Sequence, residues 1–290
     1  MKSKIKSCDK LIIVRGGGDI ATGTIYKLWK CGFSVLVLET LTPSSIRRFV
    51  SLSEAVYDGA AKVEDLTARR VRSLDQAWEV IQEGDVPVMV DPDCKILNEV
   101  RPYALVDAIL AKKNLGTTRD MSDITIGLGP GFTAGMDVDL CVETMRGNDL
   151  GRVIEHGSPL ANTNTPGVIA GYGKERVIHS PAAGVLLASH KIGDIVKKDE
   201  EIAVIAAPDG ECVPVKATLS GLLRGMIRDN YPVTKGFKIC DIDPRKSEYE
   251  NCFRISDKAR CVAGGVLEGI LYLGRRLNGA VIQEEKYDLS

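Results

Sequence analysis

The stretch Leu11-Ile-Ile-Val-Arg-Gly-Gly-Gly-Asp-Ile-Ala21 decides the fold that the sequence predicts. Its apolar start, residues 11–14, indicates a buried strand, the glycines a tight turn, and residues 20–30 a helix. A second apolar strand is predicted over residues 35–38. Strand, glycine turn, helix and strand together make the βαβ unit that opens a Rossmann-like sheet.

The glycine turn matches the pattern G-x-G-x-x-[GA] through Gly16, Gly18 and Ala21. Glycines let the backbone approach a phosphate, whose charge is attracted by the N–H groups at the start of the helix. Glu39 follows Gly18 by 21 residues, close to the usual place of an acidic ribose ligand. A turn that binds no ligand is the alternative. We predict that a nucleotide or another phosphorylated ligand is bound by Gly16, Gly17, Gly18, Asp19 and Glu39.

The next part of the chain continues the alternation of strands and helices. Its predicted strands cover residues 60–66, 86–91, 123–126 and 138–144, and its helices lie over 75–83 and within 98–113. This alternation predicts an α/β fold with a doubly wound parallel sheet. We assign residues 1–176 to a Rossmann-like ligand-binding domain.

A second glycine-rich segment, Gly127-Leu-Gly-Pro-Gly-Phe-Thr133, follows one of these strands. Successive backbone N–H groups in such a loop can bind an anion, although Pro130-Gly131 also suits a simple type II turn. The predicted cofactor-binding set therefore includes Gly127, Gly129, Gly131 and Thr133.

The sequence defines catalytic residues less sharply. Asp91 and Cys94 follow a predicted strand, at the edge where open α/β sheets bind ligands, although an Asp-Pro-Asp segment is also a common capping turn. Arg146 follows a later strand, and His156 leads into a polar loop. The candidates are Asp91, Cys94, Arg146 and His156. No histidine spacing indicates a metal site.

Composition excludes several classes of protein. Lys and Arg total 38 against 39 Asp and Glu, which argues against nucleic acid as a partner. No apolar run has the length of a membrane span. The eight cysteines form no CxxC pair, and the sequence begins without a secretory signal, so we expect a cytoplasmic protein with reduced thiols. Homo-oligomer formation stays open.

An internal repeat with an offset of 37 residues begins near residue 177 and matches Gly184 with Gly221 and Ile205 with Ile242. Residues 177–244 resemble the barrel-sandwich hybrid of biotinyl and lipoyl carrier domains. The segment 206–212 lacks the lysine that those domains modify, so we expect docking rather than carriage of a prosthetic group. Residues 245–290 are assigned to a C-terminal helix, over 256–277, that packs back on the first domain.

Several longer motifs are similar to those of the YqeB-type accessory proteins of selenium-dependent molybdenum hydroxylases. They cover residues 13–23, 105–117, 127–135, 143–147 and 255–260. The resemblance implies a role in maturing such a hydroxylase, with the hydroxylase or its cofactor-delivery proteins as partners. It implies a helper that acts on such a hydroxylase or on its pterin-based cofactor, and delivery of labile selenium is one form that this role could take.

The sequence is thus compatible with three functions. The first is an accessory factor that binds a nucleotide or molybdopterin-type cofactor at the glycine loops. The second is an NAD(P)-dependent oxidoreductase, with Glu39 on the ribose and Asp91 or His156 as proton donor. The third is a non-catalytic docking scaffold in which the glycine turns are structural.

Overall fold

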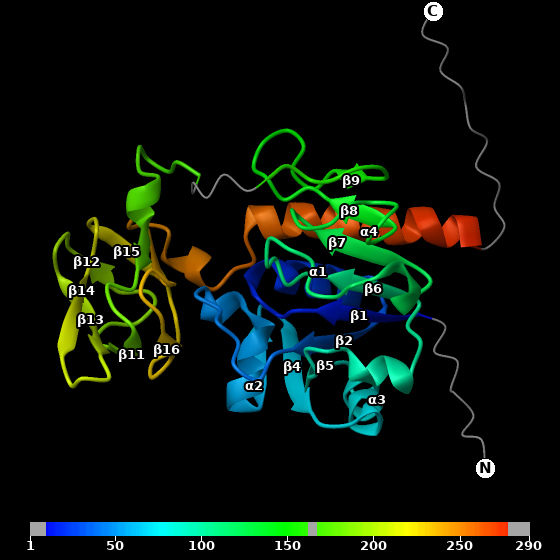
Figure 1. Ribbon diagram of the computed structural model, residues 1–290, viewed down its shortest axis with the longest axis horizontal. Helices are drawn as coiled ribbons and strands as arrows, with labels where there is room; N and C mark the ends of the chain where they lie inside the picture. The colour runs from blue at the N-terminus through cyan, green and yellow to red at the C-terminus, as the bar shows by residue number, and fades with distance from the viewer. Residues whose placement is uncertain (1–9, 162–166, 278–290) are drawn as a thin grey trace, which may run out of the picture.

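The computed structural model describes residues 10–161 and 167–277 of the chain. Figure 1 shows a large sheet flanked by helices and, beside it, a smaller part made only of strands, with α4 (Asp257–Leu277) running along the large sheet. We call the first part the sheet part and the second, residues 177–244, the β part.

The sheet part contains a nine-stranded sheet in the order β3-β4-β5-β2-β1-β6-β7-β8-β9. Its inner strands run parallel to one another, whereas both edge strands are antiparallel to their neighbours. The strands are β1 (Leu11–Arg15), β2 (Ser34–Glu39), β3 (Ala60–Val63), β4 (Leu66–Val71), β5 (Val86–Val90), β6 (Ala104–Asp107), β7 (Thr125–Leu128), β8 (Leu140–Val142) and β9 (Val153–Ile154).

Helices cover both faces of this sheet. Successive side chains of a strand point to opposite faces, so Ile12 and Val14 of β1 enter one core and Leu11 and Ile13 the other. The first core includes α1 (Asp19–Lys30) and α4, and the second includes α3 (Leu74–Gln82). A short helix, α2 (Ala55–Asp58), precedes β3. Burial on both faces explains why β1 is a continuous apolar run.

The β part consists of two four-stranded sheets in which every pair is antiparallel. The orders are β10-β17-β15-β12 and β14-β13-β11-β16. Residues matched by the 37-residue offset, such as Ile205 and Ile242, are buried in one shared core. The strands are β10 (Val177–His179), β11 (Gly184–Ala188), β12 (Ile195–Val196), β13 (Glu201–Ala206), β14 (Cys212–Lys216), β15 (Gly221–Met226), β16 (Pro232–Val233) and β17 (Lys238–Asp243).

The fold class predicted from the sequence is wrong. The large sheet is mixed, and β6, β7 and β8 follow one another without an intervening α-helix, so it is not doubly wound. The helix predicted within residues 98–113 is replaced by β6 and irregular chain. Instead, α4, from the far end of the sequence, packs on the sheet face that crossover helices cover in a doubly wound fold.

The barrel-sandwich hybrid predicted for residues 177–244 is also withdrawn. A repeat in the sequence specifies which strands correspond, but it does not specify how two sheets close over their core. The segment folds as two four-stranded antiparallel sheets.

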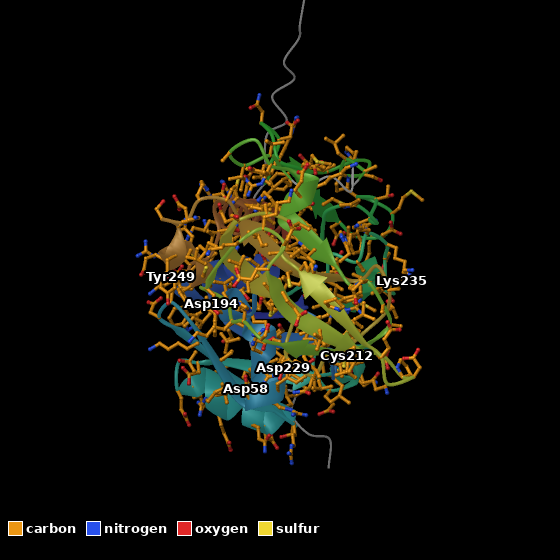
Figure 2. The ribbon with its side chains drawn as sticks, turned by 90° about the vertical axis from the view of Figure 1, so that its left-hand side faces the viewer. Asp58, Asp194, Cys212, Asp229, Lys235 and Tyr249 are labelled. Atoms are coloured by element: carbon orange, nitrogen blue, oxygen red, sulfur yellow. The ribbon has the colours of Figure 1, made fainter. Side chains whose placement is uncertain are left out.

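Several polar contacts join the β part to the sheet part. The Met226 backbone N–H donates to the Ile46 carbonyl at 3.0 Å, and Arg48 Nε donates to the Met226 carbonyl at 2.9 Å. Arg228 pairs with Glu54 at 2.9 Å and also with Asp58. Figure 2 shows this end of the molecule, with the labelled Asp58 near Asp229, the neighbour of Arg228.

Within the described ranges, no helix combines the length and the apolar character needed to cross a membrane.

Candidate functional site

A cavity of about 270 Å³ lies where the carboxyl ends of β1, β2 and β6 meet. The turn after β1 contributes Gly16 and Gly18, and the start of α1 contributes Asp19. Glu39 ends β2, and Ser45 comes from the segment that follows. We call this space the glycine cavity. It occupies the edge at which open parallel sheets bind ligands.

The three glycines of the turn have different surroundings. Gly16 has φ +92°, a conformation that favours glycine. A Cβ on Gly17 would lie 2.9 Å from the Ser53 backbone nitrogen, so the neighbouring chain fills that space. A Cβ on Gly18 would meet only Ser45 Oγ, at 3.6 Å. Of the three glycines, Gly18 is therefore the one that lines the cavity with free space beside its Cα atom.

Glu39 is buried and fixes the glycine turn. Its carboxylate accepts hydrogen bonds from the Gly17 and Thr40 backbone N–H groups, each at 2.7 Å. Burial raises the pKa of Glu39, and these two hydrogen bonds act in the opposite direction. The Gly17 N–H is thus not free for a phosphate. Because a carboxylate oxygen accepts more than one hydrogen bond, Glu39 can still accept one from a ligand hydroxyl.

Cations lie close to the start of α1. Lys258, on the first turn of α4, has a lowered pKa because of its burial and because of Arg146, whereas Asp19 and Glu143 favour its charged form. Burial also lowers the pKa of Arg47, which is again attracted to Asp19. The glycine cavity therefore opens at a helix N-terminus, which suits an anion, but the charged side chains that line it are the acids Asp19 and Glu39, and Arg47 and Lys258 lie outside its lining.

The second glycine segment does not line the glycine cavity. A Cβ on Gly127 would lie 2.5 Å from the Phe132 ring, and the Gly129 N–H donates to the Val142 carbonyl at 2.9 Å. Gly131 packs against the backbone of Lys113, and the Thr133 N–H donates to Asp137 at 2.8 Å. The contacts of this segment are internal ones that fold it around the buried Phe132 ring.

Asp91 and Cys94 do not line the glycine cavity, although the Asp91 backbone N–H donates to the Glu39 carbonyl at 3.1 Å. The Asp91 carboxylate accepts the Lys95 and Ile96 backbone N–H groups at 2.9 and 2.8 Å, which makes it a cap for the 3-10 turn Lys95–Asn98. Burial raises the pKa of the Cys94 thiol to about 11. Asp91 therefore caps its own turn, and the Cys94 thiol is buried.

His156 is exposed on the segment after β9 and does not line the glycine cavity. Arg146 is placed elsewhere, in a bidentate pair with Asp257 at 3.0 and 3.2 Å. It lines a larger cavity of about 440 Å³ between the β part and the start of α4. Four further arginines line the same space, and sequence reasoning had missed them: Arg176, Arg224, Arg245 and Arg254.

In the described chain, no group of three or more His, Cys, Asp and Glu side chains is arranged to hold a metal ion.

None of the known protein-family models matches the chain. A curated protein of Escherichia coli K12, named "Uncharacterized protein YqeB", is 46% identical over 273 residues. This chain is a relative of YqeB. The alignment covers 94% of this chain and 49% of YqeB, so the chain spans about half the length of that relative. The name of YqeB states no activity.

Some solved structures also show a weak likeness to this relative of YqeB. The ectoine utilization protein EutE (DoeB) from Ruegeria pomeroyi is 10% identical, with a TM-score of 0.26 over 80% of this chain and 85% of that one. An aspartoacylase family protein from Mesorhizobium loti is 12% identical, with a TM-score of 0.28 over 80% and 84%. Likenesses this weak carry no inference about activity. They also give no support to a barrel-sandwich hybrid.

Proposed function

We propose that the protein binds a nucleotide or molybdopterin-type cofactor through its phosphate at the glycine cavity. We propose further that it does so as an accessory factor in the maturation of selenium-dependent molybdenum hydroxylases. The binding proposal is supported by the open backbone at Gly18, which faces the cavity at the start of α1. The maturation role depends on the resemblance of the sequence motifs, and the kinship with YqeB is compatible with it.

Such a ligand has two ends, a phosphate and a hydroxyl, that different groups of the cavity can bind. A phosphate near Gly18 would meet the N-terminal N–H groups of the twelve-residue helix α1, with the charges of Arg47 and Lys258 close by. A ligand hydroxyl would find the buried Glu39 carboxylate as an acceptor. A cofactor with both a phosphate and a ribose or pterin hydroxyl satisfies both groups.

Hydride transfer has less support than binding. The proton donors considered for an NAD(P)-dependent oxidoreductase, Asp91 and His156, do not line the glycine cavity. Asp91 is also held by two backbone N–H groups of its own turn. We therefore propose binding and not redox catalysis as the role of this cavity.

The test is a thermal-shift panel with NAD, ATP, CTP, GTP and isolated molybdenum cofactor. A ligand that binds only the native state at 100 times its Kd adds about 2.7 kcal/mol of stability. We expect one of these ligands to raise the Tm of the wild-type protein and to lose that effect in Gly18→Val. The Gly264→Ala variant is the control, because a Cβ there meets only the distant Lys27 ammonium at 3.9 Å.

The Gly18→Val variant should fold, because the nearest atom to the new Cβ is a single serine oxygen. Circular dichroism and the Tm without ligand establish this. Unchanged ligand affinity in a folded Gly18→Val protein would show that the glycine cavity is not the binding site.

A further inference from the structure

Five arginines line the cavity of about 440 Å³ between the β part and the start of α4, which we call the arginine cavity. It shares no lining residue with the glycine cavity. The arginines come from separate segments of the chain: Arg146, Arg176, Arg224, Arg245 and Arg254. Such a concentration of guanidinium groups around one space needs an explanation, because like charges repel one another.

Nearby carboxylates pair with four of these arginines. Arg146 pairs with Asp257 at 3.0 Å and Arg176 with Asp241 at 3.3 Å. The other two pairs are Arg245 with Asp243 at 2.8 Å and Arg254 with Glu250 at 3.6 Å.

Arg224 has the longest ion pairs of the five. Its guanidinium comes no closer than 4.0 Å to Asp241 and Asp243, each of which already pairs with another arginine. Its Nε atom is buried and has no hydrogen-bond partner in the described part of the chain. The Nε of Arg176, a side chain only 6% exposed, is unpartnered there in the same way.

These unsatisfied donors are costly to the free protein. A buried donor without a partner lowers the stability of the protein, and more so when it is charged. The neighbouring Arg47 adds to the positive charge: its pKa is lowered by its burial and then by Arg224. An anion in the cavity would reduce the repulsion between these cations.

We propose that the arginine cavity binds the phosphate group of a small phosphorylated molecule, with Arg224 as its principal donor. A guanidinium offers paired N–H groups that match two oxygens of a phosphate. Several such groups around one space match the three terminal oxygens of a phosphate better than the two oxygens of a carboxylate. Ser256, the residue before α4, and Asp257, its first residue, also line the cavity. The positive end of this 21-residue helix therefore faces the same space.

The experiment is isothermal titration of the full-length protein with orthophosphate, pyrophosphate and citrate at about 50 mM salt, where screening is weak. The two phosphates distinguish a single phosphate from a diphosphate as the preferred group, and citrate tests whether any polyanion suffices. We expect Arg224→Gln to weaken phosphate binding by about tenfold or more, since hydrogen bonds to charged groups contribute about 1.5–3 kcal/mol. Arg152→Gln, at an exposed arginine paired only with Asp149 in the described chain, is the matched control and should bind normally.

The Tm without ligand separates a binding role for Arg224 from a structural one. If Arg224 serves a ligand, Arg224→Gln changes this Tm little, because its ion pairs with Asp241 and Asp243 are 4.0 Å long and each of these carboxylates keeps a closer arginine. A lowered Tm together with unchanged phosphate binding would overturn the proposal. Citrate binding as tight as that of pyrophosphate, or no phosphate binding by the wild type at millimolar concentration, would overturn it too.

The Gly18→Val variant separates this proposal from that for the glycine cavity. It should bind phosphate normally, because Gly18 does not line the arginine cavity. Loss of phosphate binding in Gly18→Val but not in Arg224→Gln would place the anion in the glycine cavity and so contradict the present inference.

Discussion

Gly265 of α4 lies so close to Gly151 that a Cβ on Gly265 would be 2.1 Å from the Gly151 carbonyl oxygen. The helix therefore packs directly on the backbone of the segment between β8 and β9. The neighbouring residue, Gly264, faces open space apart from the Lys27 ammonium. Two adjacent glycines of one helix thus have opposite surroundings.

We expect Gly265→Ala to destabilise the protein by about 1–3 kcal/mol, because the helix or the segment must move to admit the methyl group. The matched Gly264→Ala variant should be neutral or up to about 1 kcal/mol more stable, since alanine is the better helix former. Urea denaturation of both variants measures the difference. Equal effects at the two positions would show that the contact with Gly151 does not limit the packing of α4.

A second prediction concerns the Asp-Pro-Asp segment. Asp91→Ala removes the acceptor of two backbone hydrogen bonds and should cost about 0.5–2 kcal/mol, the usual range for a lost cap. Asp93→Ala is the control, because Asp93 is exposed and its ion pair with Lys95 is exposed too. Ligand affinity should stay unchanged in both. A loss of affinity in Asp91→Ala at full stability would instead restore Asp91 as a functional residue.

The third prediction is that the cysteines divide into two classes of reactivity. Cys31, Cys212 and Cys261 are exposed, whereas burial raises the pKa of Cys94 to about 11 and that of Cys141 to about 12. At about pH 8 iodoacetamide should therefore alkylate the exposed thiols of the native protein first. Peptide mapping measures the order in which the cysteines are alkylated. Early modification of Cys94 would contradict the burial on which its pKa depends.

Two buried thiols, Cys94 and Cys141, should make the protein less stable at alkaline pH. Their folded pKa values lie above the ordinary value of 9.0, so their contribution is fully present below about pH 9 and is lost as the pH rises through 11 to 12. The free energy of unfolding should fall over this range. In a Cys94→Ala variant that fall should be smaller, which equilibrium denaturation at several alkaline pH values would measure.

Local patterns predicted the first βαβ unit well. The apolar run of β1, the glycine turn and α1 are continuous in sequence, and the spacing to Glu39 correctly brought that residue to the same cavity as Gly18. The second glycine segment has a similar composition but folds around Phe132. Glycine content alone does not distinguish a loop that faces a ligand from one that encloses a side chain.

Long-range packing explains what the sequence did not reveal. Residues 104–107 were expected within a helix but form β6, because pairing with β1 and β7 outweighs the local pattern. The sequence did not indicate the arginine cavity either. Its cations come from separate segments, and each one alone resembles an ordinary surface charge until the β part and α4 meet.

The last prediction concerns the contact of Arg228 with Glu54, which joins the β part to the sheet part. Glu54 is buried, which raises its pKa, and Arg48 and Arg228 act against that shift. In Arg228→Met the nearest remaining cation is Arg48, at 4.0 Å. We expect a loss of about 1–3 kcal/mol at pH 7, the cost of a buried group left without its hydrogen bond.

The loss should depend on pH in a defined direction. Without Arg228 the pKa of Glu54 rises further, and a carboxyl group with a raised folded pKa contributes stability that is present below its unfolded pKa and lost as the pH rises. The difference between wild type and Arg228→Met should therefore grow from about pH 4.5 to pH 7. Adding Glu54→Gln should recover part of the stability at pH 7, whereas Asp58→Asn, at the exposed partner of Arg228, should cost less than about 1 kcal/mol. A difference that is flat with pH, or a double variant as unstable as Arg228→Met, would show that Arg228 joins the two parts through packing on Tyr57 and not through the charge of Glu54.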